Sequence, residues 1–358
     1  MKRYMEVDKM KEQYEILKKV GNIQQTAAVR KIEFQEGRAR GMQGYDIKNG
    51  PLRFQVMGDK CLDISELSYK GINLSFLAKS GLIGRMDYDT HGEEGTSNIM
   101  GGLLFTCGLE NTCLACREGE AYYPMHGRVR SAPGEQLCAS AGWEEGKYRI
   151  AVSGQMREGK LFGNHMCLSR RVETVYGERK ILITDEIENL AYREEPMMVL
   201  YHFNMGYPFL DEGARVILPT KKVTPRDEAA MKQQELWDQM EAPADNEPER
   251  VYLHELAEDR EGNTFACLIN ERLQLGLRIR FSRKYLPYFV QWKSLASGDY
   301  VMGLEPTNSG VYGRSREGEH LHTMQPFEKE KIQFSIEILE GEEELKAASD
   351  EAQLLLQR

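Results

Sequence analysis

Hydrophobic and polar residues alternate along most of this chain, and this is the period of a β-strand with one buried face. The segment 274–281 places Leu, Leu, Ile and Phe on one face and arginines on the other, and the segment 331–339 repeats the pattern. Similar stretches predict further strands at 52–57, 148–153, 166–175, 180–188, 197–204 and 286–292. Many alternating strands divided by turns with Gly, Asn and Asp predict an all-β antiparallel sandwich or barrel.

Three windows have the composition of helices instead. Residues 1–20 are rich in Lys, Glu, Met and Leu and precede a Gly-Asn stop signal, the window 227–240 follows a Thr-Pro pair, and residues 342–356 are rich in Ala, Glu and Leu. We therefore expect an N-terminal helical extension over 1–20, one β domain over 21–340 and a C-terminal helical tail over 341–358. The sequence shows neither a βαβ rhythm nor the glycine patterns of nucleotide-binding folds.

Composition narrows the class of protein. With 41% hydrophobic and 29% charged residues, the 358-residue chain has the make-up of a globular protein. No stretch approaches the ~18–20 consecutive apolar residues that span a bilayer, and residues 1–20 lack the apolar region of a signal peptide. The net charge of −9 argues against a nucleic-acid partner. We expect a cytoplasmic protein without membrane or nucleic-acid partners, its seven cysteines reduced; a homodimer is one option for its assembly.

Polar residues of catalytic type occur within apolar or glycine-rich runs in three parts of the chain. The first comprises 101–111 and 124–128, the second is 200–208, and the third comprises 291–293 and 303–308. Each part also has a structural interpretation, because a histidine on a strand is more often a core or edge residue, and a glutamate before a proline can simply end a strand. Taken singly, these segments do not establish a function.

The order of these motifs resembles that of the aldose 1-epimerase (galactose mutarotase-like) superfamily, most closely its domain-of-unknown-function 4432 branch. The resemblance extends from about Val20 to Leu339 and includes the segments 20–25 and 58–64, where this branch typically has arginine in place of Lys60. The family fold is a β-supersandwich, in agreement with the strand pattern. We therefore expect a large antiparallel β-supersandwich with short helices at both termini.

The resemblance implies roles for three residues. His126 resembles the sugar-contacting histidine of the family's H-G motif, His202 resembles its general acid, and Glu305 resembles its general base. An ionised Glu305 would be expected to keep a neighbouring His202 protonated. The implied activity is that of a cofactor-independent isomerase without a metal, which interconverts the anomers or epimers of an aldose or related sugar. The other candidate sugar contacts are Asn111, Arg128, Asn204, Gln291, Trp292 and Lys293.

Strand geometry limits these contacts. On one strand His202 and Asn204 project to the same face, and only one parity of 291–293 can face a ligand. The family's substrate-binding arginine has two candidates here, Arg53 and Arg128. Its substrate-binding aspartate cannot be placed among Asp211, Asp227, Asp238, Asp245 and Asp259.

Other functions remain open from the sequence. The same pocket would serve a non-catalytic carbohydrate-binding protein or sensor. His320 and His322 lie on one side of an extended segment and could serve a metal-dependent lyase or isomerase. Cys113 and Cys116 have the spacing of half a zinc or redox site. His91, in a loop rich in glycine and acidic residues, could line the site.

Overall fold

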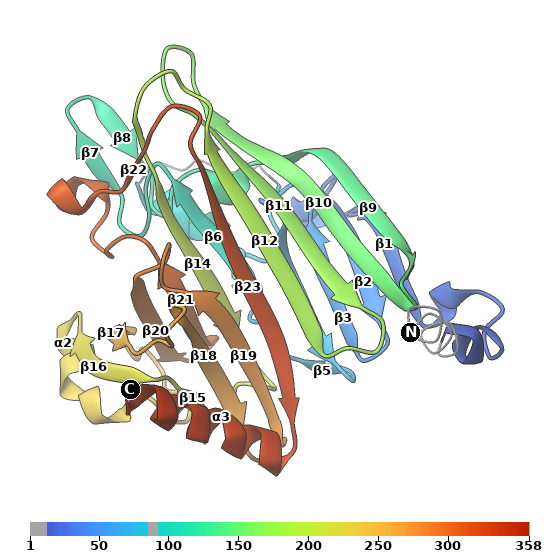
Figure 1. Ribbon diagram of the computed structural model, residues 1–358. Coiled ribbons are helices and arrows are strands. Elements are labelled where there is room, and N and C mark those ends of the chain that lie inside the picture. Colours follow the sequence, from blue (N-terminus) through green and yellow to red (C-terminus); the bar gives the residue numbers. More distant parts are fainter. Residues whose placement is uncertain (1–12, 85–91, 358) are drawn as a thin grey trace.

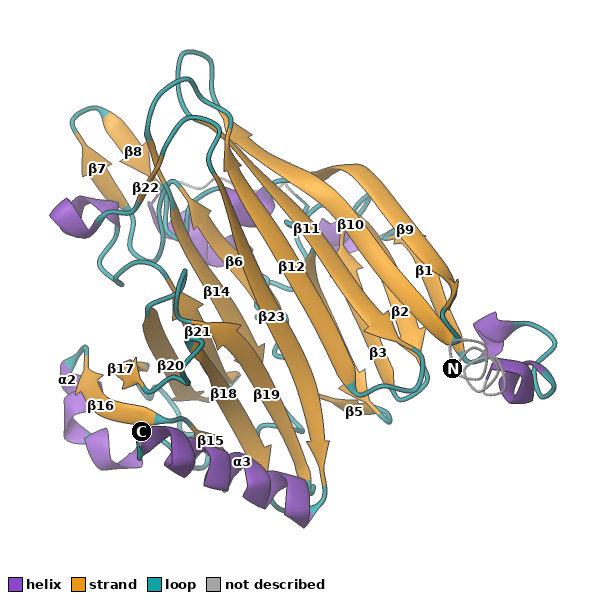
Figure 2. Ribbon diagram, viewed as in Figure 1, coloured by secondary structure: helices purple, strands orange, loops and turns teal. Residues whose placement is uncertain are grey.

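The computed structural model describes residues 13–84 and 92–357, and it consists largely of antiparallel β-sheets (Figures 1 and 2). The largest sheet has eight strands in the order β15-β18-β19-β23-β12-β11-β10-β9. In chain order these strands are β9 (Gly134–Glu144), β10 (Lys147–Gly159), β11 (His165–Val175), β12 (Lys180–Asn189), β15 (Arg215–Ile217), β18 (Asn263–Asn270), β19 (Leu275–Ser282) and β23 (Lys329–Glu340).

Two further sheets lie behind the eight-stranded sheet in the view of Figure 1. The five-stranded sheet is formed in chain order by β1 (Ala27–Glu33), β2 (Gln43–Asn49), β3 (Leu52–Met57), β4 (Asp63–Tyr69) and β5 (Ile72–Asn73). The six-stranded sheet has the order β16-β17-β20-β21-β14-β6. Its strands are β6 (Leu104–Leu109), β14 (Met198–Met205), β16 (Thr220–Pro225), β17 (Arg250–Leu256), β20 (Tyr288–Ala296) and β21 (Asp299–Thr307).

Short elements complete the fold. Two small antiparallel pairs are the hairpin of β7 (Cys116–Glu118) with β8 (Ala121–Tyr123), and the pairing of β13 (Glu195–Pro196) with β22 (Thr323–Met324), which are far apart in the chain. The 3₁₀ helices are η1 (Ile23–Gln25), η2 (Gly37–Ala39), η4 (Gly92–Asn98), η5 (Val129–Ser131), η6 (Gln234–Leu236), η7 (Arg314–Arg316) and η8 (Gly318–His320). The α-helices with assigned bounds are α2 (Glu228–Lys232) and α3 (Glu342–Leu356).

The core lies between the large sheet and the two sheets behind it. Its members come from all three sheets, for example Phe54 on β3, Phe334 on β23 and Leu304 on β21. Tyr201 and Phe203 on β14 also point into this core. Because successive side chains of a strand face opposite ways, the residues between them point to the other side of the six-stranded sheet. The expected all-β supersandwich is confirmed.

The helix expectations had mixed outcomes. The C-terminal helix occupies 342–356 as expected, whereas the N-terminal expectation lies mostly outside the described residues, with 13–17 helical. A continuous helix over 227–240 was wrong, because only α2 and η6 form there. Backbone carbonyl groups after η6 accept hydrogen bonds from distant residues instead. For example, the Lys293 Nζ donates to the carbonyl oxygen of Gln239 at 2.5 Å.

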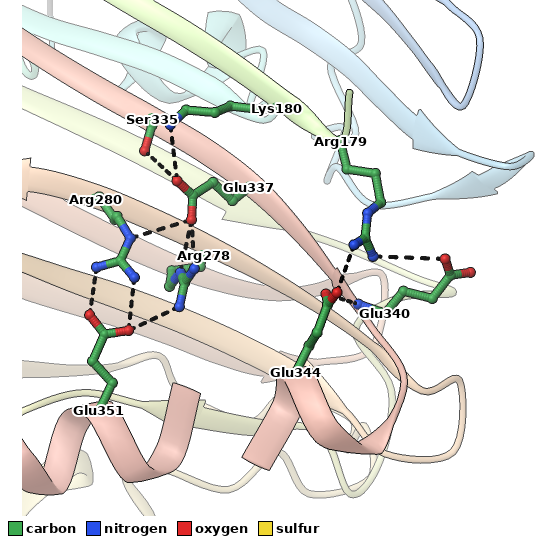
Figure 3. Close-up of polar contacts among 9 residues, drawn as sticks. All are labelled: Arg179, Lys180, Arg278, Arg280, Ser335, Glu337, Glu340, Glu344 and Glu351. Carbon is green, nitrogen blue, oxygen red and sulfur yellow. Dashed lines mark hydrogen bonds and ion pairs between the residues drawn. The ribbon is translucent and has the colours of Figure 1, made fainter. Parts of the chain in front are cut away.

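The helix α3 packs on the outer face of the large sheet and runs along its lower edge in Figure 1. Ion pairs hold it there. Glu351 accepts hydrogen bonds from Arg278 and Arg280 on β19, and Glu344 accepts one from Arg179 (Figure 3). Beneath these pairs, apolar side chains of α3 meet those of β18. The buried residues of this second cluster include Phe265, Cys267, Ile269, Leu345, Ala348, Ala352 and Leu355.

Candidate active site

His202 and Glu305 lie side by side on neighbouring strands of the six-stranded sheet. The register of β14 and β21 pairs Phe203 with Leu304, which sets His202 directly opposite Glu305. The Nε2 atom of His202 is 3.0 Å from Oε1 of Glu305, and the side chains are only 11% and 4% exposed. The sheet therefore brings together the two residues for which opposed proton-transfer roles were predicted.

Burial shifts the pKa values of both residues of this pair. It raises the pKa of Glu305 well above its usual range, an effect that Arg226 opposes and Glu249 reinforces. Burial also lowers the pKa of His202 to about 3. The Nε2–Oε1 approach lacks hydrogen-bond geometry, because Oε1 has no hydrogen-bond partner among the described residues. Burial therefore favours the neutral form of both groups, whereas the sequence led us to expect an ionised Glu305 beside a protonated His202.

His126 approaches the pair from a loop after β8. Its ring centroid is 6.1 Å from that of His202, and the ring of Phe105 on β6 makes T-shaped contacts with both histidine rings. The loop is fastened to β6, because the Gly108 amide donates to the His126 carbonyl oxygen at 3.1 Å. The next residue, Gly127, has a φ of +69°, and a Cβ there would lie 2.0 Å from the carbonyl oxygen of Gly108. The H-G pair therefore requires its glycine for this close approach.

Burial also lowers the pKa of His126 well below its usual range, and the charges of His202 and Arg130 act in the same direction. The imidazole is therefore neutral at physiological pH. Its Nδ1 is buried and has no hydrogen-bond partner among residues 13–84 and 92–357. The same is true of Nδ1 of His202. Buried polar atoms are normally hydrogen-bonded, so two unpaired nitrogens in one place indicate that a ligand supplies their partners.

The three side chains line a cavity with a volume of about 520 Å³. Its walls are mainly apolar and include Phe76, Phe105, Val251, Val290, Trp292 and Val311. Asn204 adds a further polar group, because its Nδ2 donates to the carbonyl oxygen of Gly102 at 3.1 Å while its Oδ1 is left without a partner in the described part of the chain. Apolar walls with a few convergent polar groups are typical of a small-molecule site.

A buried charge cluster supports the strands behind the pair. Arg170 contacts Asp63 at 2.6 Å and Asp185 at 2.6 Å, with all three side chains 0% exposed. Thr106 on β6 donates to Asp63, and the hydroxyl group of Tyr201, the neighbour of His202, donates to Asp185. Burial raises the pKa of Asp63 to about 6, although Arg170 opposes this shift. The cluster joins β4, β6, β11, β12 and β14, and so fixes the strand that presents His202.

Only one member of the 291–293 triplet faces the cavity. Trp292 lines it, with a ring centroid 5.3 Å from that of His202. Gln291 and Lys293 project to the other face, where Gln291 contacts His254 at 2.9 Å and Lys293 donates to the Leu236 carbonyl oxygen at 2.7 Å. We therefore withdraw both as candidate sugar contacts, since strand parity turns them away.

Asn111 and Arg128 organise the neighbouring loops instead of lining the cavity. Asn111 is fully buried, and its Nδ2 donates to the carbonyl oxygens of Leu114 and Pro124. Arg128 donates to Glu110 at 2.5 Å on the surface side of its loop. These contacts use the polar groups that were expected to meet a sugar, so neither residue stays among the candidate contacts.

The cavity also contains charged residues that the sequence did not indicate. Arg226, Glu247, Glu249 and Asp299 line it. None of the five aspartates considered for the family's substrate-binding position is among the lining residues, and Arg53 pairs with Asp46 on the surface. Neither Arg226 nor Glu249 lies in a sequence motif that could have identified it as a site residue.

The histidines and cysteines considered for a metal or redox site do not lie together in such a site within the described residues. His322 contacts Glu330 at 2.6 Å, whereas His320 ends η8. Cys113 and Cys116 are free thiols. Within the described ranges, no three His, Cys, Asp or Glu side chains gather in a group that could hold a metal ion. His91 lies outside the described residues.

Comparison with known proteins identifies the family. The sequence profile of a family described as a domain of unknown function, DUF4432, matches residues 39–338. The chain belongs to this family. The helix α3 lies beyond the matched region.

No curated protein matches the sequence. No helix in the described part of the chain has the length and apolar character needed to cross a membrane.

Solved structures show the same fold. A candidate aldose 1-epimerase from Klebsiella pneumoniae superposes with a TM-score of 0.88 at 19% identity, over 94% of this chain and 89% of that chain. A galactose mutarotase-like protein from Clostridium acetobutylicum gives 0.60 at 15% identity, over 88% of this chain and 99% of that one. Galactose 1-epimerase from Lactobacillus acidophilus gives 0.59 at 14% identity, over 88% and 100%. At these identities the likeness establishes the galactose mutarotase-like fold.

Proposed function

We propose that this DUF4432 protein is an isomerase that interconverts the anomers of an aldose or related sugar. The observation that supports the proposal most directly is the buried contact of 3.0 Å between His202 and Glu305 at a cavity that also contains His126 and Trp292. An acid and a base at one buried point are what opening and closing of a sugar ring require. The names of the structural relatives from Klebsiella and Lactobacillus point to the same reaction.

The chemistry needs one proton removed from the O1 hydroxyl group and one delivered to the ring oxygen. As the C1–O5 bond breaks, C1 becomes a carbonyl carbon and O5 becomes a hydroxyl group. Rotation about the C1–C2 bond and reversal of these steps then close the ring on the other face. Positioned acid and base groups each contribute about 10²–10⁴-fold, which suits a reaction that already proceeds slowly in water.

The neutral forms that burial favours assign a starting role to each residue of the pair. Neutral His202 accepts the O1 proton, and protonated Glu305 supplies a proton to the ring oxygen. Ring closure uses the same groups in the opposite sense, so the pair returns to its resting state after either direction. His126 and Asn204 offer a free ring nitrogen and a free carbonyl oxygen to sugar hydroxyl groups. The acid–base chemistry of this scheme needs no cofactor.

A panel of anomerically pure sugars, followed by NMR saturation exchange, tests the proposal. We expect the native protein to accelerate exchange of at least one sugar, and Glu305→Gln or His202→Asn to reduce the rate by about 100-fold or more. Glu330→Gln and His254→Asn are matched controls, since Glu330 also contacts a histidine and His254 is also buried, both away from the cavity. Undiminished exchange in both active-site variants would refute the proposal. Sugar binding without exchange by the native protein would instead indicate a carbohydrate-binding protein.

A further inference from the structure

A continuous set of contacts leads from the rim of the cavity to the acid–base pair. The Nη2 atom of Arg226 donates to Oε1 of Glu249 at 3.0 Å. The indole Nε1 of Trp292 donates to Oε2 of the same carboxylate at 2.7 Å. The Trp292 ring in turn contacts the His202 ring in an edge geometry, with 5.3 Å between centroids. All four side chains line the cavity.

We propose that Glu249 and Arg226 are positioning residues that fix the plane of the Trp292 indole, so that the ring is preorganised as a platform for the apolar face of the ligand. The inference rests on the proposed function only for the nature of that ligand. Sugars expose C–H groups on one face of the ring, and a tryptophan offers a large, rigid surface for them.

The hydrogen bond to Glu249 is well suited to orient the indole. An indole has a single N–H donor, so one bond fixes the direction of the ring edge. The acceptor is a carboxylate, and hydrogen bonds to ionised groups are shorter and stronger than neutral ones. Because Trp292 is only partly buried and borders an open cavity, packing alone leaves one side of its ring unsupported.

Arg226 keeps the carboxylate in place. Glu249 is 53% exposed, and a lone carboxylate at such a position would move freely in solvent. Arg226 is itself fastened to the sheet, because its backbone amide donates to the Val251 carbonyl oxygen at 2.9 Å. The two oxygens of Glu249 therefore receive separate donors, one from the end of the β16–β17 ladder and one from β20.

The same ladder offers a matched control. Lys222 on β16 pairs with Glu255 on β17 at 3.4 Å, and the two residues are partners in the strand register. Both side chains are more than 60% exposed, and neither lines the cavity. Removal of this ion pair therefore tests the general effect of losing a charge pair between β16 and β17.

Time-resolved fluorescence anisotropy tests the positioning role without any need for turnover. The chain has three tryptophans, so Trp143→Phe with Trp237→Phe leaves Trp292 as the only tryptophan, which is excited selectively at the red edge of the absorption band, where tyrosine does not absorb. In this background Glu249→Ala is expected to increase the amplitude of fast indole motion, Glu249→Gln to restore most of the order because its amide oxygen still accepts the N–H, and Glu255→Ala to change nothing. Native-like anisotropy in Glu249→Ala would overturn the inference.

Kinetics separate positioning from chemistry. Glu249→Ala is expected to raise the KM for the exchanged sugar about fivefold, since ordering a mobile side chain on binding opposes affinity, while kcat changes less than KM. In the anisotropy measurement, Arg226→Gln should add little to the indole motion of the Glu249→Ala background, because Arg226 acts on the indole through Glu249. An unchanged KM in Glu249→Ala would overturn the positioning role. If the native protein exchanges no sugar, the proposed function fails, and the anisotropy result still decides the role of Glu249.

Discussion

A Cβ atom on Gly303 would lie 2.7 Å from Cε1 of His202 and 2.9 Å from Oε1 of Glu305. Gly303 is on β21, two residues before Glu305, and pairs with Asn204 of β14. The φ of Gly303 lies outside the left-handed region, so the backbone itself would accept alanine. The missing side chain thus creates the space in which the acid–base pair makes its contact.

Gly303→Ala is therefore expected to abolish exchange without unfolding the protein. The new methyl group must displace His202 or Glu305, and a displacement of about 1 Å can reduce a catalysed rate by about 100-fold. The measurement is the NMR exchange rate beside a thermal unfolding curve. Gly142→Ala on β9 is the control, since a Cβ there meets nothing within 4 Å. Native exchange in the Gly303 variant would show that the pair needs no such space.

Glu305→Gln is expected to stabilise the protein at neutral pH. Burial raises the pKa of Glu305, so the folded state keeps a proton that the unfolded chain releases above about pH 4.3. The native protein therefore loses stability as the pH rises above this value, whereas glutamine does not titrate. The Tm difference between variant and native protein should widen from pH 4 to pH 8. Glu330→Gln should give no such gain, and a Tm difference that is independent of pH would contradict the cause.

Lys293→Met is expected to lower the free energy of unfolding by about 3 kcal/mol, because it leaves two carbonyl groups without their buried donor and removes one cationic partner of the Glu241 carboxylate, which Arg250 also contacts. Lys293 is 0% exposed, pairs with Glu241 and donates to the Leu236 and Gln239 carbonyl oxygens. Urea unfolding measures the loss. Exchange per folded molecule should stay native, since Lys293 faces away from the cavity. If the variant loses exchange but keeps its stability, Lys293 takes part in the site and this prediction is wrong.

Glu351→Ala is expected to loosen α3. The variant removes the carboxylate that holds the helix to Arg278 and Arg280 (Figure 3). Cys267 is fully buried in the apolar cluster that α3 covers. Alkylation of Cys267, followed by peptide mass spectrometry at neutral pH, should become several-fold faster. Asp350→Ala is the matched control, because Asp350 pairs with Lys346 within the helix. Equal labelling rates in the two variants would show that apolar packing alone holds α3.

The strands were predictable because one face of each meets the core. The alternation over 274–281 and 331–339 corresponds to β19 (Leu275–Ser282) and β23 (Lys329–Glu340) within one or two residues. The window 227–240 has equally clear helical composition, yet most of it is not α-helical. There the Leu236 and Gln239 carbonyl groups bind Lys293, a residue far along the chain. Local propensity contains no information about such a partner.

The site was only partly predictable. His126, His202, Asn204, Trp292 and Glu305 all line the cavity. Parity showed that Trp292 and its neighbours could not share a face, but the sequence could not say which face meets the cavity. Arg226 and Glu249 are 23 positions apart, and only the β16–β17 pairing brings them together. Their role therefore depends on a register that no local pattern encodes.

The two halves of this site are built on different kinds of scaffold. His202 and Glu305 project from paired strands inside the sheet, where any insertion would shift the register of many side chains at once. Arg226 and Glu249 lie at the two ends of the connection between β16 and β17, outside the paired strands, so a change of side chain there leaves the strand register intact. Under the proposed function, we expect the His202–Glu305 pair to stay constant within the family while ligand preference changes at the two ends of this connection. The proposed proton-transfer pair would in this way serve sugars of different structure.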